Sequence, residues 1–92
     1  MSEQQIQKKI LDWLASEGHY CFKVVAASKV GVPDIISCVR GRFIAFEVKK
    51  PTTKNNVSAL QQYNIRKIEE SGGGALVVWD VEQVKRFVNE AL

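Results

Sequence analysis

Three titratable residues, Asp34, Glu47 and Lys49, stand beside apolar runs where charged side chains need a physical reason. Two carboxylates a few ångströms apart repel each other unless a proton or a cation lies between them. A hard divalent ion such as Mg²⁺ binds through one or two carboxylates together with water and phosphate oxygens. A lysine beside such an ion could orient or deprotonate a water, or stabilise charge developing on a phosphate. The alternative is a structural ion pair between Lys49 and Glu47 or Asp34.

A predicted β-hairpin brings these three residues together. Residues 34–39 and 43–49 are rich in β-branched and aromatic side chains, and the turn between them contains Gly41. If the hairpin is centred near Gly41, opposed residue numbers sum to about 82, which places Asp34 near Val48. Because side chains alternate along a strand, Glu47 and Lys49 should share one face of the sheet. The two carboxylates and the ammonium group are therefore expected to converge at one end of the hairpin.

Two predicted helices each add one polar side chain that could face this site. Glu3 lies on the apolar stripe of a helix over residues 3–17, where it could ligate a metal or simply be a first-turn acid favoured by the helix dipole. Gln61 lies on the apolar face of a helix over residues 57–71. A buried amide needs partners, and either a metal-bound water or phosphate, or other protein groups, would serve.

The remaining elements complete an α-β-β-β-α-β-α order. Strands are predicted over residues 20–27 and 75–79, and a last helix over residues 80–90. With 92 residues and no linker or repeat, we expect a single domain spanning residues 1–92 and an α/β (α+β) fold.

Several features bear on the compartment. No apolar run approaches the roughly 20 residues of a membrane helix, and the N-terminus lacks the layout of a signal peptide. Cys21 and Cys38 lie in strand-like runs and are expected to be reduced core residues. These features predict a cytoplasmic protein that contacts no membrane.

Positive charge is concentrated in the middle of the chain. Residues 20–67 contain nine basic and two acidic side chains, a local charge of +7, whereas the rest holds four basic and eight acidic ones. Such a segment suits a polyanion such as nucleic acid, although a basic solvated surface would have the same composition.

The motifs resemble those of a known nuclease family. Gly31-Val32-Pro33-Asp34, twelve residues, and then Glu47-Val48-Lys49 resemble the PD-(D/E)XK signature. Glu3, the run Ser58-Ala59-Leu60-Gln61 and the glycines before the last strand are similar to the virus-type replication-repair nuclease (VRR-NUC) branch. The resemblance covers about residues 3–80.

This resemblance implies a restriction-endonuclease-like αβββαβ core, with a mixed sheet flanked by helices. It implies Mg²⁺, or Mn²⁺ in its place, held by Glu3, Asp34, Glu47 and the backbone carbonyl of Val48, and no small-molecule cofactor. It also implies that Lys49 positions the attacking water, with Gln61 at the same catalytic site. Stand-alone family members are typically small homodimeric proteins of phages or bacteria, so the resemblance implies a bacterial host cell and is consistent with a phage gene.

The expected activity is metal-dependent hydrolysis of DNA phosphodiesters. Symmetric cutting of both strands of a four-way junction calls for a twofold dimer, which favours a homodimeric Holliday-junction resolvase. A flap or nicking nuclease and a non-catalytic DNA-binding module are the alternatives. The residues expected to contact DNA phosphates are Lys23, Ser28, Lys29, Lys50 and Lys54.

Overall fold

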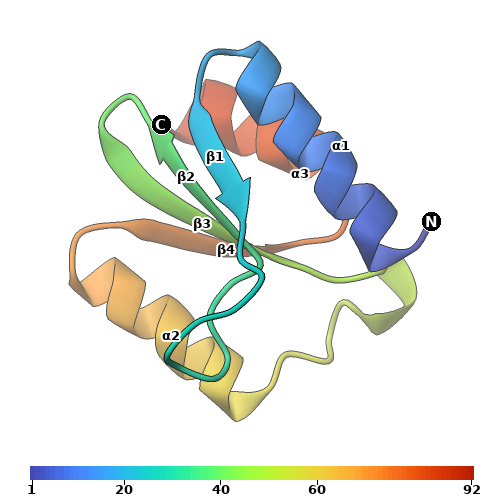
Figure 1. Ribbon diagram of the computed structural model, residues 1–92, viewed down its shortest axis with the longest axis vertical. Helices are drawn as coiled ribbons and strands as arrows, with labels where there is room; N and C mark the ends of the chain where they lie inside the picture. The colour runs from blue at the N-terminus through green and yellow to red at the C-terminus, as the bar shows by residue number, and fades with distance from the viewer.

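Four strands form one mixed sheet in the order β1-β2-β3-β4 in the computed structural model, which describes residues 1–92 (Figure 1). Antiparallel pairing joins β1 to β2 and β2 to β3, and parallel pairing joins β3 to β4. The elements are α1 (Glu3–Ser16), β1 (Tyr20–Lys23), β2 (Ile35–Val39), β3 (Arg42–Val48), a 3₁₀ turn (Pro51–Thr53), α2 (Ala59–Glu70), β4 (Gly74–Val78), α3 (Val81–Arg86) and a π-helical turn (Phe87–Ala91). This αβββαβα order and the mixed sheet confirm the predicted fold class.

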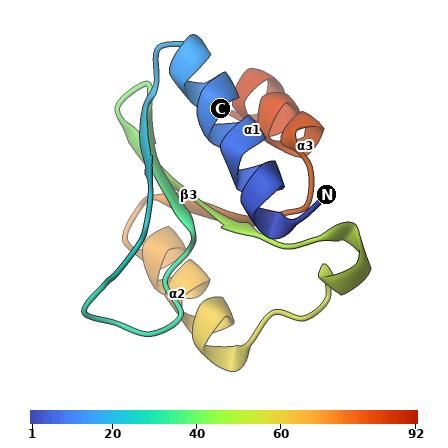
Figure 2. The same cartoon turned by 45° about the vertical axis from the view of Figure 1, so that its right-hand side comes forward.

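Helices cover the two faces of the sheet unequally. Figures 1 and 2 show α1 and α3 together on one face and α2 on the other. The main core lies on the α1 and α3 side, because its buried side chains come from these helices and from the facing positions of β2, β3 and β4. In α2 only Asn64 is buried, so the α2 face of the sheet is more thinly covered.

The β2–β3 hairpin has a tighter register than predicted. Ile35 pairs with Phe46 and Val39 with Arg42, so opposed residue numbers sum to 81 instead of about 82. The reason is a two-residue turn in which Arg40 and Gly41 both have positive φ, 52° and 80°, as a type I′ turn requires. Continuing this register places Asp34 opposite Glu47.

Strand β1 is shorter than the predicted strand over residues 20–27. Its ladder ends at Lys23, with one further bond from Val24 N–H to the Asp34 carbonyl at 2.8 Å. The partner strand begins only after Pro33, which has no N–H to donate, so the chain leaves the sheet there.

Helix boundaries shift by one or two residues from the predicted ones. Ser2 caps α1 and Ser58 caps α2, so α2 begins at Ala59 and not at Val57. The last predicted helix divides into α3 and the π-helical turn, and β4 begins at Gly74, one residue early.

The two cysteines are free thiols, but they are not both core residues. Cys21 is half-buried, whereas Cys38 is exposed, which contradicts the prediction for that residue. Cys38 lies on the α2 side of β2, but α2 packs chiefly on β4, so Cys38 stays exposed. None of the helices combines the length and apolar character that crossing a bilayer requires.

Candidate active site

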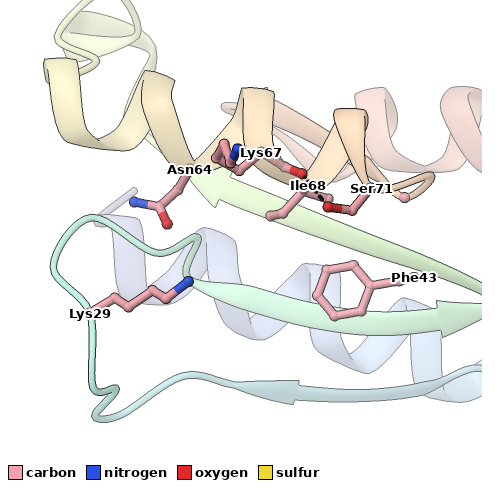
Figure 3. A pocket seen from close by; sticks show the side chains of 7 residues that line it. Lys29, Phe43, Asn64, Lys67, Ile68 and Ser71 are labelled. Atoms are coloured by element: carbon pink, nitrogen blue, oxygen red, sulfur yellow. Dashed lines mark hydrogen bonds between the residues drawn. The ribbon is translucent and has the colours of Figure 1, made fainter.

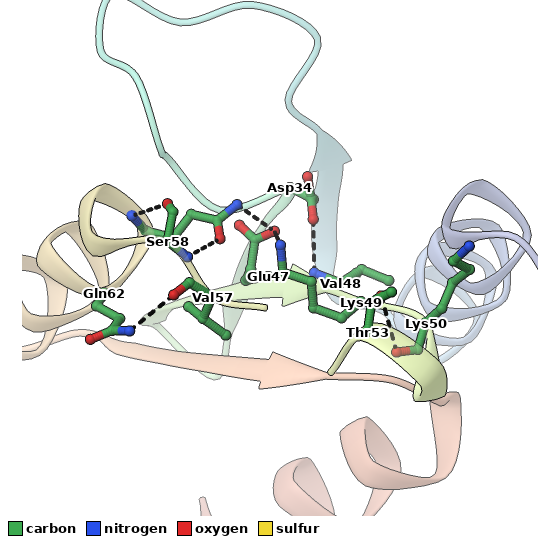
Figure 4. Close-up of polar contacts among 10 residues, drawn as sticks. Asp34, Glu47, Val48, Lys49, Lys50, Thr53, Val57, Ser58 and Gln62 are labelled. Carbon is green, nitrogen blue, oxygen red and sulfur yellow. Dashed lines mark hydrogen bonds and ion pairs between the residues drawn. The ribbon is translucent and has the colours of Figure 1, made fainter. Parts of the chain in front are cut away.

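Asp34 lies immediately before β2, and its side chain closes the open end of the hairpin. Its Oδ2 accepts a hydrogen bond from the backbone N–H of Val48 at 2.7 Å (Figure 4). If the β2–β3 register is continued by two residues beyond Ile35, Pro33 lies opposite Val48. The next ladder hydrogen bond from the β2 side would then need a backbone N–H of Pro33 as its donor. Because proline has no N–H, the carbonyl of Val48 lacks that ladder donor. From the sequence, Pro33 counted only as part of the Gly31-Val32-Pro33-Asp34 motif, and this consequence was missed.

Glu47 is a buried carboxylate on the same side of the sheet as Asp34. It is 3% exposed, and Lys49 approaches its Oε2 at 3.7 Å. The shared face of Glu47 and Lys49 therefore confirms the predicted alternation, and the structure contains the ion pair that the sequence left as an alternative role. The ion pair and the expected metal chemistry are compatible, because the same lysine can serve both.

The environment of Glu47 raises its pKa from 4.5 to about 8. Burial is the largest cause, followed by the negative charge of Asp34 and a hydrogen bond with it, and Glu3 adds a smaller effect. Lys49 acts in the opposite direction but does not compensate. Burial and the neighbouring carboxylates therefore favour the protonated, neutral form of Glu47 over its ionised form.

Gln61 joins the first turn of α2 to Glu47. Its Oε1 accepts from Ser58 N–H at 3.0 Å, and its own N–H donates to Ser58 Oγ at 3.1 Å, which together make a capping box. Its Nε2 then donates to Glu47 Oε2 at 3.3 Å. Protein groups thus satisfy the amide, which was one of the two interpretations that the sequence left open.

Glu3 stands in the first turn of α1 and is half-buried. It borders a shallow hollow of about 350 Å³ together with Lys50, and it acts on Glu47 through its charge. No group of three or more His, Cys, Asp or Glu side chains in the structure has the arrangement of a metal site. Asp34 and Glu47 therefore lie together as a pair, and Glu3 does not join them in a three-carboxylate metal site.

The residues expected to contact DNA are all on the surface. Lys23 ends β1, Ser28 and Lys29 lie in the β1–β2 loop, and Lys50 and Lys54 follow β3. None of the four lysines forms an ion pair, although Lys54 Nζ lies 4.8 Å from the centroid of the Trp79 ring. Their charges are free to meet a polyanion, and the contacts themselves stay a prediction.

The fold is that of known solved structures. One, described as "VRR_NUC domain", superposes with a TM-score of 0.82 at 21% sequence identity and covers 100% of both chains. A second, described as "VRR_NUC domain protein", has a TM-score of 0.76 at 20% identity and covers 98% of this chain and 87% of that chain. No family model matches the sequence, and neither does any curated protein. The chain thus has the VRR_NUC fold, which confirms at the level of structure the resemblance that its motifs carry.

Proposed function

We propose that this protein is a metal-dependent endonuclease that hydrolyses DNA phosphodiesters. The observation that carries this proposal is the juxtaposition of a buried carboxylate, Glu47, with Asp34 across the hairpin and with Lys49 at 3.7 Å. The fold likeness to VRR_NUC domains and the +7 central segment support a polyanionic substrate.

The donor set fits a hard divalent cation. Asp34 and Glu47 offer carboxylate oxygens, and Val48 offers a carbonyl without its ladder donor, which are the ligand types that Mg²⁺ or Mn²⁺ prefers. A cation bound there would offset the burial and the carboxylate repulsion that raise the pKa of Glu47. When bound there, the ion would polarise a phosphate and neutralise charge developing on its oxygens. Glu3 remains a proposed further ligand.

Backbone and side-chain groups of the chain itself hold this site in shape. The Val48 N–H orients Asp34, and Gln61 orients Glu47 from the helix. Lys49 is only 12% exposed, so its ammonium group is confined near the carboxylates. From there it is placed to hold an attacking water, which is the role that we assign to it.

The exposed lysines then fix the DNA by its phosphates and carry little base information. This favours recognition of DNA shape over sequence. Each chain contributes one site, so symmetric cutting of a four-way junction requires two chains related by a twofold axis. We therefore propose a homodimeric Holliday-junction resolvase as the specific form of the activity.

The test is to incubate the purified protein with four-way junction, flap, nicked and intact duplex DNA in Mg²⁺, Mn²⁺ or EDTA. We expect symmetric junction cuts in Mg²⁺ and Mn²⁺, none in EDTA, and a dimer by light scattering on the same sample. Cutting that survives EDTA would contradict the metal mechanism. Preferred cutting of flaps or nicks would show that the protein is a nuclease with another substrate preference and not a resolvase. Binding without any cutting would show that it is a non-catalytic DNA-binding module.

A further inference from the structure

We propose that a hollow beside α2 binds one unpaired nucleotide of the DNA strand, a few positions from the cut. This inference rests on the proposed endonuclease activity, and it makes an unpaired nucleotide near the cut, as at a flap or at a junction with opened base pairs, the substrate feature that the site selects. The hollow has a volume of about 330 Å³, at the lower end of the range for small-ligand sites (Figure 3). Its main lining residues are Lys29, Phe43, Asn64, Lys67, Ile68 and Gly73.

One wall of the hollow suits the face of a base. The ring of Phe43 is 47% exposed, and Ile68 lies beside it. A Cβ at Gly73 would lie 2.9 Å from the Phe43 carbonyl oxygen, 3.2 Å from its Cδ1 and 3.0 Å from Ile68 Cγ2. Only glycine fits there, so no side chain from position 73 fills the space beside the ring. An exposed aromatic ring is a platform on which any base can stack.

The charge of the hollow suits a phosphate. Lys29 from the β1–β2 loop and Lys67 from α2 both line it, and no acidic residue does. Lys29 forms no ion pair, and Lys67 pairs only with the exposed Glu70 at 3.4 Å. Two ammonium groups beside an aromatic ring are the combination that single-stranded nucleic acid requires.

The hollow is formed in advance by contacts between the loop and the helix. Asn64 is 9% exposed, and its Nδ2 donates to the carbonyls of Val30 at 3.1 Å and Leu60 at 2.9 Å. Gly31 packs so closely on Leu60 that a Cβ would lie 2.9 Å from it. These contacts hold Lys29 over the hollow, and they leave Asn64 Oδ1 as an acceptor for a base amino or imino group.

The hollow and the carboxylate pair lie on the same face of one strand. Phe43 and Glu47 are four residues apart on β3, so both point toward α2, at a separation of about 13 Å for four strand residues. Along α2, Gln61 meets Glu47 while Ile68 lines the hollow. Stacked nucleotides advance about 3.4 Å each, so the bound nucleotide is roughly three or four positions from the scissile phosphate. The proposed base is unpaired, because a base inside a duplex has both faces covered by its stacked neighbours and leaves no face for the ring of Phe43.

The test measures binding of the full chain in EDTA, where no metal-dependent cutting occurs, with short oligothymidylate and with blunt duplex as probes. We expect Phe43→Ala to weaken oligothymidylate binding about tenfold and to leave duplex binding nearly unchanged. Phe43→Tyr should restore binding. Phe22→Ala is the matched control, because Phe22 is 44% exposed on the same sheet but outside the hollow. Lys67→Ala should weaken binding and reduce its salt dependence, whereas Lys85→Ala, which removes an ion-paired lysine from α3, should not.

A second readout locates the ligand. Thymidine monophosphate should shift the backbone amide NMR signals of Phe43 and Gly73, and inorganic phosphate should not shift them to the same extent. Equal shifts by phosphate would reduce the hollow to an anion site and overturn the proposal, as would Phe43→Ala binding like the wild type. A chain that binds through Phe43 but cuts nothing in Mg²⁺ would refute the nuclease and keep the hollow. A chain that cuts normally with Phe43→Ala and binds unchanged would refute the hollow alone.

Discussion

Asp34 Oδ2 lies 2.7 Å from the backbone nitrogen of Val48 and accepts the hydrogen bond that would otherwise belong to the strand ladder. The residue opposite Val48 in the continued register is Pro33, which cannot complete the ladder pair. Asp34 thus has two roles: one of its oxygens accepts a structural hydrogen bond, and its negative charge acts on Glu47. The two roles can be separated by mutation.

Asp34→Asn should keep the fold and abolish metal-dependent cutting, because an amide oxygen can still accept from Val48 N–H but carries no charge. Asp34→Ala removes the acceptor as well, and it should cost about 1–3 kcal/mol in the free energy of unfolding. Urea unfolding and junction cleavage of both variants give the comparison. If Asp34→Asn cuts at the wild-type rate, the assigned site is wrong.

Glu47 should make the protein less stable as the pH rises. Its pKa is about 8 in the folded protein and near 4.5 when unfolded, so between these values the folded state holds a proton that the unfolded state has lost. Stability is therefore greatest below the lower value, declines through this window and levels off above about 8. Glu47→Gln should flatten the decline and at pH 8 be more stable than the wild type, by about 1–3 kcal/mol.

Thermal melts of both proteins across this range check the prediction. Mg²⁺ at pH 8 should raise the melting temperature of the wild type, because the ion favours ionised Glu47, and should leave Glu47→Gln almost unaffected. A wild-type melting temperature that is the same at both ends of the window would contradict the burial argument.

Lys49→Ala should lose cutting by about a hundredfold or more while DNA binding persists, since the ammonium group lies beside the carboxylates and is mostly shielded from solvent. The loss of this positive charge should also raise the pKa of Glu47 further. Cleavage rates measure the loss of cutting, and fluorescence anisotropy on the same junction measures DNA binding. Loss of binding equal to the loss of cutting would show that Lys49 is a phosphate contact and not a catalytic residue.

Gln61→Ala should slow cutting by roughly tenfold beyond its effect on stability, because it frees Glu47 from its partner on α2. The matched control is Gln5→Ala, since Gln5 completes the same kind of capping box with Ser2 at the start of α1. Both variants should lose about 0.5–1 kcal/mol of stability. Equal cleavage rates in the two variants would limit Gln61 to capping its helix.

The sequence by itself determined the helices and strands and the two residues of the carboxylate pair, Asp34 and Glu47. Alternation along residues 43–49 placed Glu47 and Lys49 on one face, and the Gly41 turn joined the strands that bring Asp34 to them. These are local properties, because a strand's periodicity and a turn's chemistry depend on residues close together in the chain.

Tertiary structure decided the properties that depend on which parts of the sheet a helix covers. The positive φ of Arg40 tightened the register by one, and the partial cover by α2 buried Glu47 yet left Cys38 exposed. Gln61 donates a hydrogen bond to Glu47, which lies on a different element. The hollow beside Phe43 exists because Gly73, far away in the sequence, packs against Phe43 without a side chain. Burial and pKa are sums over neighbours distant in sequence, so no local pattern contains them.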